Sequence, residues 1–529
     1  MFIKSTLIST GSLFRAVCYS TTINNGFNLK RTLDKVKRQE DNKILKSVLR
    51  NRIIECPKDV DVLRSEVINS KGNFSERNVD RALLNHFCHE GQFRNGINYI
   101  EFLNKEIKSK LNLFLVIQTF RMYYYERHRK KSLSNVEEEY LISLYKDLRN
   151  SFPILDVVSI ECAILGLSIT KEWKKCLDLL QEASRIDQPS NTSYNAVIAS
   201  AFLNGEEEIG WMLIKEMFEK HRTPSYVAFS AYIEKLEQVK NKTEIMMKLE
   251  KLFTLCKEND IILPEKVIEE LGSLLRTNSI QANLTSINKR GCCSCCQQKL
   301  DAFEVTNEMF EELKDKFITN VIVGKNIFSK TTPEEFARFQ SFLKTIDDCS
   351  VVIDGLNVAY SVGTKHSSSV CSAFLANVVA YFVNRNKKVL VLGREHMNRW
   401  PKKNWNYVKN NAKLFLTQDL SQDDPYLLYA ALHLGKNTMI VTRDLMRSHL
   451  FLLKEPSDKI MFSRWLSQRQ YQIKYVTGFG KVIFNIPMPY MRTIQKNGDY
   501  LHIPYQTKEE KNNESNETSN SWLCIHLSS

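Results

Sequence analysis

A self-similarity within the first half of this chain constrains its fold most strongly. Three segments resemble one another and begin at Val158, Thr192 and Val227, 34 and 35 residues apart. Each is followed by a second amphipathic segment, and residues 51–275 have helical periodicity with little Pro or Gly. Paired helices of this kind bury their apolar faces only by stacking on neighbouring pairs. The pattern predicts an α-solenoid, extended by weaker pairs at 79–103 and 113–148. A solenoid that binds a protein or acts as a scaffold is the plainest interpretation of the repeats alone.

The second half of the chain has a different pattern, in which short apolar runs alternate with helical segments from Ser350 onward. Strands are predicted at 351–354, 388–392, 413–417 and 438–442, and helices at 370–384, 402–411, 425–434 and 445–453. This alternation predicts a parallel sheet with helices on both faces. Ligands of such sheets bind at the carboxyl ends of the strands.

Four aspartates follow predicted strands at that edge: Asp354, Asp423, Asp424 and Asp444. Taken singly, Asp424 before Pro425 and Asp444 could be helix caps, and Asp354 beside Gly355 could belong to a phosphate-binding turn. Four carboxylates that converge on one edge would repel one another unless cations neutralise them. Mg²⁺ is the natural ion for carboxylate ligands, and two such ions can support hydrolysis of a phosphodiester. No Walker loop or dinucleotide-binding glycine motif competes with this interpretation.

Composition favours a large multidomain protein with a polyanionic partner. The chain has 529 residues, of which 43% are hydrophobic, enough for two or three cores. Its formal charge of +14 favours nucleic acid or an acidic membrane surface. No apolar run approaches the roughly 18 residues that span a bilayer. Basic residues near the predicted site, including Arg443, Arg447 and Arg464, are candidates for phosphate contacts.

The amino-terminal segment has the composition of a mitochondrial transit peptide. Residues 1–33 contain Lys4, Arg15, Lys30 and Arg31, are rich in Ser and Thr, and have no acidic residue. A disordered basic tail is the alternative. A transit peptide predicts a location in the mitochondrial matrix, where thirteen cysteines are thiols or metal ligands rather than disulfides.

A cysteine cluster at 292–296 predicts half of a zinc site. Two Cys-x-x-Cys registers fit, Cys292 with Cys295 or Cys293 with Cys296. His502 and Cys524, close to the other end of the chain, are the candidate partners. Such a site would join the segment before the aspartate domain to the segment after it. Reactive thiols without a metal are the alternative.

Taken together, these parts and their order resemble the protein-only ribonuclease P family, most closely its animal mitochondrial branch. The likeness rests on repeats that resemble pentatricopeptide repeats, with Tyr194-Asn195 as the clearest match, on the cysteine knuckle, and on the motifs Val-Ile-Asp-Gly-Leu-Asn-Val and Thr-Arg-Asp-Leu-Met-Arg-Ser-His. In the repeat family a polar residue on the first helix of each unit helps to read a base. Glu161, Asn195 and Ser230 occupy that position.

The resemblance implies a multidomain α plus α/β architecture with four parts. These are a leader at 1–33, a pentatricopeptide-repeat solenoid at 51–275, a zinc-binding connector split between 276–345 and 485–529, and a PIN-like (NYN) metallonuclease domain at 346–484. Asp354, Asp423, Asp424 and Asp444 would bind two Mg²⁺ ions, or Mn²⁺. Cys293, Cys296, His502 and Cys524 would bind Zn²⁺.

The implied reaction is endonucleolytic removal of the 5′ leader from precursor tRNA. The implied partner proteins are a tRNA methyltransferase and a short-chain dehydrogenase. Two alternatives stay open, namely a PIN-like ribonuclease that acts on mRNA or rRNA, and a non-catalytic pentatricopeptide-repeat protein that binds RNA. A glutamine, Gln297, follows the cysteine knuckle where the family usually has glycine, and the doubled cysteines leave the zinc register open.

Overall fold

The computed structural model describes residues 40–50, 52–106, 112–130, 133–318, 332–346, 348–363, 366–418, 423–444, 446, 450, 452–453, 455–476, 482–507 and 520–527. The chain divides into two compact units, Met1–Ala231 and Tyr232–Ser529. The predicted leader at 1–33 lies outside the described residues. The finer division into four parts stays a prediction.

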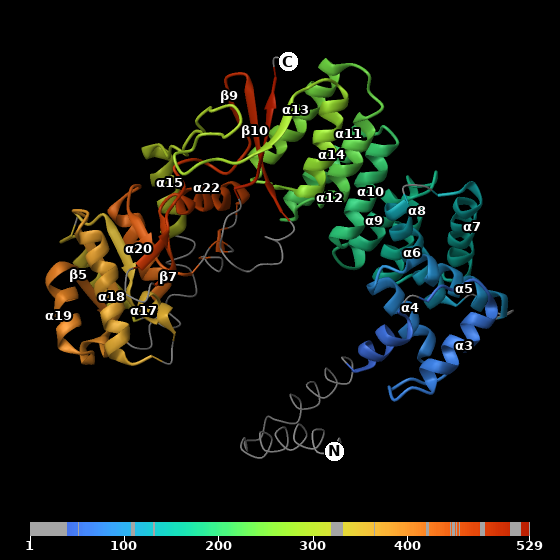
Figure 1. Cartoon of the computed structure of the whole chain (residues 1–529), viewed down its shortest axis with the longest axis horizontal. Coiled ribbons are helices and arrows are strands. Elements are labelled where there is room, and N and C mark those ends of the chain that lie inside the picture. The colour runs from blue at the N-terminus through green and yellow to red at the C-terminus, as the bar shows by residue number, and fades with distance from the viewer. Residues whose placement is uncertain are drawn as a thin grey trace. The chain divides into compact units, whose positions relative to one another are not determined.

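The first unit is helical, and its helices follow one another along the chain in antiparallel pairs (Figure 1). They are α3 (Pro57–Ile68), α4 (Val79–His89), α5 (Phe93–Glu106), α6 (Leu113–Lys130), α7 (Asn135–Ser151), α8 (Val157–Ser168), α9 (Lys175–Ile186), α10 (Asn191–Leu203), α11 (Glu207–Glu219) and α12 (Tyr226–Leu236), which continues into the second unit. The predicted solenoid is therefore confirmed, including the weaker pairs α4–α5 and α6–α7.

The repeat period is set by the residues that begin the first helix of each pair. Asp156 caps α8 by accepting a hydrogen bond from the Ser159 N–H, and Ser190 caps α10 in the same way through Ser193. These caps are 34 residues apart in the sequence. Small residues let the helices approach, since Gly166 of α8 lies directly against the ring of Phe120 in α6.

The second unit begins with a helical hairpin and a five-stranded sheet. The hairpin contains α13 (Lys242–Glu258) and α14 (Glu265–Thr277). The sheet contains β1 (Leu263–Pro264), β2 (Ala282–Thr285), β9 (Gln495–Asn497), β10 (Tyr500–Gln506) and β11 (Trp522–His526). Strands from both sides of the aspartate domain therefore join in one sheet, so the connector is assembled from distant segments of the chain.

A six-stranded sheet forms the aspartate domain, in the order β5-β4-β3-β6-β7-β8. The strands are β3 (Val351–Asp354), β4 (Val389–Arg394), β5 (Lys413–Thr417), β6 (Met439–Val441), β7 (Gln470–Val476) and β8 (Val482–Asn485). The four predicted strands are parallel, as predicted; the parallel strand β7 and the antiparallel edge strand β8 were not predicted. The strand order reverses between β3 and β6, where such folds bind their ligands.

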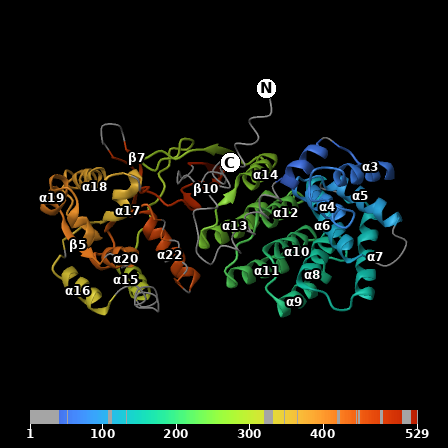
Figure 2. The same cartoon turned by 90° about the horizontal axis from the view of Figure 1, so that it is seen from below.

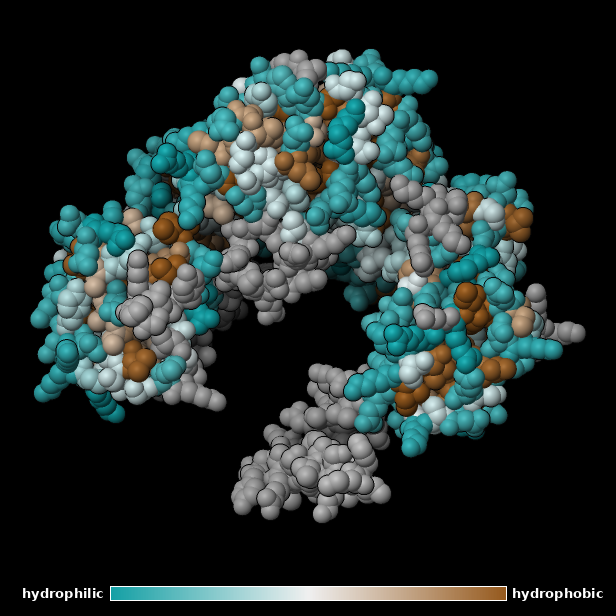
Figure 3. Space-filling view, viewed as in Figure 1, coloured by the Kyte–Doolittle hydropathy of each residue, from teal (hydrophilic) through white to brown (hydrophobic). Residues whose placement is uncertain are grey.

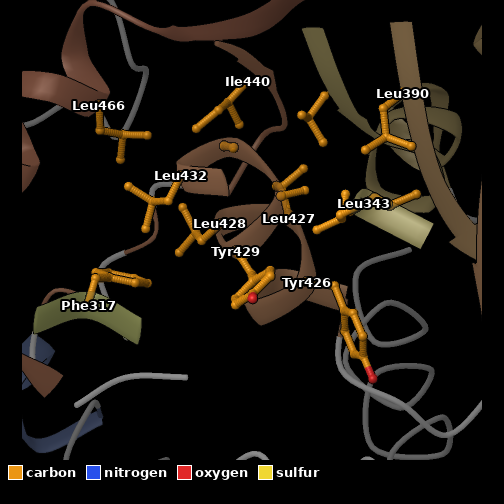
Figure 4. Close-up of a cluster of buried hydrophobic side chains, with 14 of the residues drawn as sticks. Phe317, Leu343, Leu390, Tyr426, Leu427, Leu428, Tyr429, Leu432, Ile440 and Leu466 are labelled. Atoms are coloured by element: carbon orange, nitrogen blue, oxygen red, sulfur yellow. The ribbon is translucent and has the colours of Figure 1, made fainter. Parts of the chain in front are cut away.

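Two hydrophobic cores cover the two faces of this sheet, because successive side chains of a strand point to opposite faces. Val352 belongs to the core under α15 (Asn307–Phe317), α16 (Pro333–Leu343), α20 (Asp423–Leu434) and α22 (Pro456–Ser467), and Figure 4 shows leucines of α20 pointing into it. Val351 and Ile353 belong to the core under α18 (Ser368–Val383) and α19 (Lys402–Asn411). The two groups of helices lie on opposite sides of the sheet (Figure 2).

The predicted helices at 370–384, 402–411 and 425–434 are confirmed as α18, α19 and α20, whereas most of the helix predicted at 445–453 lies outside the described residues. Trp400 and Trp465 are buried in the cores, so neither stacks on a base.

No helix among the described residues is long and apolar enough to cross a membrane. The face drawn in Figure 3 is mainly hydrophilic, with hydrophobic residues in small separate groups.

Candidate active site and metal centre

Asp354 is the last residue of β3, a strand whose four residues are all buried. Its side chain is only 3% exposed. The carboxylate caps the short helix α17 (Gly355–Ala359), because its Oδ1 accepts a hydrogen bond of 3.0 Å from the Asn357 N–H. A buried carboxylate requires donors or a cation, so the cap satisfies only part of its bonding capacity.

Gly355 makes this position of Asp354 sterically feasible. A Cβ atom at residue 355 would lie 2.7 Å from the Leu392 carbonyl oxygen and 2.9 Å from the Val391 side chain. The chain therefore turns from β3 into α17 in direct contact with the end of β4. A larger residue would push the turn, and the carboxylate that precedes it, away from the sheet edge.

Thr442 joins the ends of β3 and β6. Its buried hydroxyl donates to Asp354 Oδ2 at 3.3 Å and accepts from the Asp444 N–H at 3.2 Å. Asp444 Oδ1 in turn accepts from the N–H of Met446, whose φ is +53°, an uncommon backbone conformation for a non-glycine residue. The structure thus brings Asp354 and Asp444 together at the point where the strand order reverses.

Asp423 and Asp424 begin α20, which packs against β3, β4 and β6. Their side chains and residues 419–422 lie outside the described residues. Of the four predicted aspartates, two are therefore placed by their side chains and two by their helix alone. The chemistry of the described carboxylates fits a hard divalent cation such as Mg²⁺.

Thr442 and Asn357 are site residues that the sequence interpretation missed. Asn357 Oδ1 accepts from the Arg443 N–H at 2.9 Å, which ties α17 to the turn after β6. The spacing Thr-x-Asp directly after an apolar run was the available signal, because a hydroxyl two residues before the acid can bond its N–H.

A second cluster contains Cys293, Cys296, His502 and Cys524, whose candidate ligand atoms all lie within 4.8 Å of one another. His502 and Cys524 stand directly opposite each other on the antiparallel strands β10 and β11. The Nε2 atom of His502 lies 3.1 Å from Cys296 Sγ and 3.8 Å from Cys524 Sγ. Three thiols and one imidazole at this separation are a donor set for tetrahedral Zn²⁺.

Burial and neighbouring groups shift the pKa values of these side chains. Burial raises the pKa of the Cys293 thiol, but hydrogen bonds from Thr285 and from the backbone of the knuckle outweigh it and lower that pKa below its ordinary value. Burial lowers the pKa of His502, which favours the neutral imidazole. Burial and the neighbouring Cys293 and Cys296 raise the pKa of Cys524. A bound divalent cation would favour its thiolate.

The geometry separates the two cysteine registers that the spacing left open. Cys293 is buried, and the Cys295 N–H donates to its sulfur at 3.4 Å, as in a knuckle that folds around a metal. Cys295 is exposed and Cys292 is half-buried, and neither belongs to the cluster. Gln297 adopts a φ of +61°, the conformation for which glycine is favoured.

Among the predicted RNA contacts, Glu161 and Asn195 have intramolecular partners instead. Glu161 accepts a hydrogen bond from the N–H of Ser190, and Asn195 accepts one of 2.6 Å from the N–H of Ser225. Each side chain therefore ties one repeat to the start of the next. The Ser230 Oγ is buried and has no hydrogen-bond partner among the described residues. The polar groups of Asn195 and Ser230 are therefore buried in this conformation, and the part that all three side chains play in RNA binding stays a prediction.

Arg443, Arg447 and Arg464 differ in their surroundings. Arg443 is exposed beside Asp444 and Arg447 lies outside the described residues. The Arg464 guanidinium instead binds both carboxylate oxygens of Asp260, at 2.6 to 3.1 Å, and the Lys257 carbonyl at 2.8 Å. The paired guanidinium joins α22 to the end of α13, and a phosphate contact by Arg464 stays a prediction.

Comparisons with known proteins agree with this architecture. Residues 287–524 match the family model described as protein-only RNase P. The mouse mitochondrial ribonuclease P catalytic subunit is 29% identical over 394 residues, which cover 73% of this chain and 66% of the mouse protein. Proteinaceous RNase P 1, chloroplastic/mitochondrial, of Arabidopsis thaliana is 28% identical over 268 residues, 48% of this chain and 43% of that protein. The alignments thus span less than two thirds of these relatives.

The crystal structure of nuclear proteinaceous RNase P 2 from Arabidopsis thaliana has the same fold. It superposes with a TM-score of 0.54 at 16% identity and covers 84% of this chain and 98% of that chain. The match therefore extends from the helical repeats through the connector to the aspartate domain. Residues 287–524 are thus similar in sequence to protein-only RNase P, and most of the chain is similar to the mouse mitochondrial subunit.

Proposed function

We propose that this chain is the catalytic subunit of a mitochondrial ribonuclease P, which removes the 5′ leader from precursor tRNA. The observation that carries the proposal is the pairing of Asp354 with the Thr442–Asp444 turn at the edge of the sheet, within a domain that matches the protein-only RNase P model. Carboxylates at this edge suit phosphodiester hydrolysis, in which a cation must offset the charge of the phosphate.

In the proposed reaction the oxygen of a water molecule attacks the phosphorus at the leader junction. The bond from phosphorus to the 3′ oxygen of the leader breaks, and that oxygen takes up a proton. The phosphate therefore stays on the 5′ end of the tRNA, and the leader ends in a 3′-hydroxyl. Because water supplies the new oxygen on phosphorus and the proton on the leaving oxygen, the step needs no oxidant and no covalent intermediate.

Asp354, Asp423, Asp424 and Asp444 would hold two Mg²⁺ ions, or Mn²⁺, which supply an activated water and neutralise charge on the leaving oxygen. Asp354 suits this role because donors from Asn357 and Thr442 stabilise its ionised form and fix its orientation. Arg443 is exposed beside Asp444, and in this proposal it would contact a phosphate that flanks the cleaved bond.

Cys293, Cys296, His502 and Cys524 would hold a structural Zn²⁺. All four are protein ligands, so a tetrahedral ion would have no open position for a substrate. The ion would connect the knuckle, which precedes the nuclease domain in the sequence, to strands β10 and β11, which follow it. Its proposed role is therefore to hold the connector together, and not to react.

The helical repeats would hold the folded tRNA. Because Glu161 and Asn195 bond the neighbouring repeat, recognition would depend on the shape and charge of the tRNA more than on base reading. The named mitochondrial relatives support a mitochondrial location, which we propose is the matrix. A tRNA methyltransferase and a short-chain dehydrogenase are the partner proteins that the family resemblance suggests.

Cleavage of a precursor tRNA by the purified chain tests the proposal. We expect a mature tRNA with a 5′-phosphate in the presence of Mg²⁺, either from the chain alone or after the two partner proteins are added. Asp354→Asn keeps the side-chain shape but removes the charge, and should lower the single-turnover rate by about 10²-fold or more.

Asp348→Asn is the matched control, because Asp348 pairs with Lys388 at the opposite end of β4. It should cleave at the wild-type rate. Absence of a 5′-phosphorylated product under every condition, or equal rates for Asp354→Asn and the wild type, would refute the proposed function.

A further inference from the structure

A side chain of the neighbouring strand β7 contacts the turn after β6. This residue, Gln470, is not part of the sequence motifs described above. Gln470 is the first residue of β7. Its Nε2 donates to the carbonyl oxygen of Asp444 at 2.6 Å and faces the carbonyl oxygen of Thr442 at 3.4 Å. A single amide group therefore contacts both residues that flank Arg443 in the turn.

The contact of the Gln470 amide with the turn begins where the backbone pairing of β6 with β7 ends. Strands β6 and β7 are paired at Ile440 with Gln470 and at Val441 with Tyr471, and Thr442 follows directly. Beyond this point the chain leaves the sheet, and the next carbonyl groups face the Gln470 amide. The side chain thus continues the strand pairing for the residues that carry the acid.

The restrained turn determines where the Asp444 carboxylate can lie. The Thr442 hydroxyl fixes the Asp444 N–H on the side of Asp354, and the Gln470 amide fixes the Asp444 carbonyl on the side of β7. The turn also contains Met446 at a positive φ, a conformation that persists only when surrounding contacts maintain it. Removing one of these contacts allows the turn to relax away from Asp354.

We propose that Gln470 is a positioning residue for divalent-cation binding by the Asp354–Asp444 site. It touches neither the substrate nor the ion, and acts through the backbone of Asp444. The inference rests on the proposed function, since it assigns the aspartates to a metal site. Partners that orient metal ligands in this way typically change metal affinity by about 10- to 100-fold when they are removed.

The test compares Gln470→Met with Gln472→Met in the full chain. Methionine keeps the length of glutamine but cannot donate to the carbonyls. Gln472 lies two residues further along β7, where it pairs with Asn485, and none of its described hydrogen bonds involves the turn. Binding of Mn²⁺ to the RNA-free protein is followed by electron paramagnetic resonance, beside thermal unfolding of each variant.

We expect Gln470→Met to bind Mn²⁺ about 10-fold to 100-fold more weakly than the wild type. Gln472→Met should bind like the wild type, and all three proteins should unfold at similar temperatures. In the cleavage assay the Mg²⁺ concentration for half-maximal rate should rise by a similar factor, with the rate recovered at high Mg²⁺.

Wild-type Mn²⁺ affinity in Gln470→Met would overturn the inference, as would a loss of affinity that Gln472→Met shares. Absence of Mn²⁺ binding by the wild-type chain would overturn it as well, because it requires a site formed before RNA binds. The proposed function fails separately, if the wild-type chain binds Mn²⁺ but produces no 5′-phosphorylated tRNA.

Discussion

At the scale of single residues, the candidate active site depends on how one carboxylate is held. Asp354 is buried at the end of β3 and accepts hydrogen bonds from the Asn357 N–H and the Thr442 hydroxyl. The Thr442 hydroxyl also accepts the Asp444 N–H, so one oxygen atom links the two acids. At residue 354 one carboxylate oxygen therefore caps α17 while the other contacts Thr442.

Replacement of Thr442 tests this link. Thr442→Val has nearly the same shape but no hydroxyl, so Asp354 loses a donor and the Asp444 N–H loses its acceptor. A hydrogen bond to a charged group contributes about 1.5 to 3 kcal/mol. We expect a single-turnover cleavage rate lower by roughly 10- to 100-fold at saturating Mg²⁺.

Thr442→Ser should restore most of that rate, because it restores the hydroxyl. Thr438→Val, directly before β6, should leave that rate unchanged, since Thr438 is buried but lies at the opposite end of the strand from the acids. Equal rates for Thr442→Val and Thr438→Val would show that the hydroxyl link has no functional role.

At the scale of secondary-structure elements, the repeats are held together by close packing and by polar contacts between neighbours. Helix α8 packs on α6 through Gly166, and the ring of Phe120 occupies the space that a side chain would need. The hydrogen bonds from Ser190 to Glu161 and from Ser225 to Asn195 repeat the same connection one unit later. The solenoid therefore depends on a few small residues where helices meet.

Gly166→Ala measures this packing. In an open helix the substitution would stabilise by roughly 0.5 to 1 kcal/mol. Here the added methyl group collides with Phe120, and overpacking typically destabilises by about 1 to 3 kcal/mol. We expect net destabilisation of about 1 to 2 kcal/mol in urea unfolding followed by circular dichroism.

Gly272→Ala in α14 is the control, because only the flexible end of Arg276 approaches its methyl group, at 2.9 Å from Nη1. It should be neutral or stabilising. Stabilisation by Gly166→Ala would mean that α6 and α8 separate more readily than the packing indicates.

At the scale of the whole molecule, two sets of side-chain contacts join parts of the second unit that are distant in the sequence. The Cys293, Cys296, His502 and Cys524 cluster brings the knuckle to β10 and β11, on either side of the nuclease domain in the sequence. Arg464 of α22 binds Asp260 at the end of α13, which adds a second connection. Asp260 has a φ of +49°, a conformation that Asp adopts more readily than most non-glycine residues.

Metal removal tests the role of the Cys293, Cys296, His502 and Cys524 cluster. Structural zinc contributes on the order of 10 kcal/mol to the folded state of small zinc domains. We expect stoichiometric zinc in the purified protein by mass spectrometry, and a chelator should lower the unfolding temperature of the second unit by about 10 °C or more. Cys524→Ser should lose the metal and unfold in the same way as the chelated protein.

Cys295→Ser provides the matched control, since Cys295 is exposed and lies outside the cluster. It should retain full zinc content and stability. If Cys295→Ser loses the metal, the alternative cysteine register is correct. If Cys524→Ser keeps the metal, the cluster is not the metal site.

The sequence by itself determined the structural class of each half of the chain and many of its elements. The period between Val158, Thr192 and Val227 fixed the helical repeats, and the run from Val351 to Asp354 fixed a buried strand that ends in an acid. These are local properties, because hydrophobic periodicity and helix caps depend on residues a few positions apart. The same local signals could not show that Glu161 and Asn195 bond the next repeat, since their partners are about 30 residues away.

Only the tertiary structure decided which side chains meet. The pairing of β10 with β11 sets His502 opposite Cys524 and selects Cys293 and Cys296 over their neighbours. The strand order places Thr442 against Asp354 and Gln470 against the turn of Asp444, although these residues are separated by 88 and 26 positions. Strand register and helix packing set such contacts, and they depend on the whole hydrophobic core and not on any single segment of the chain.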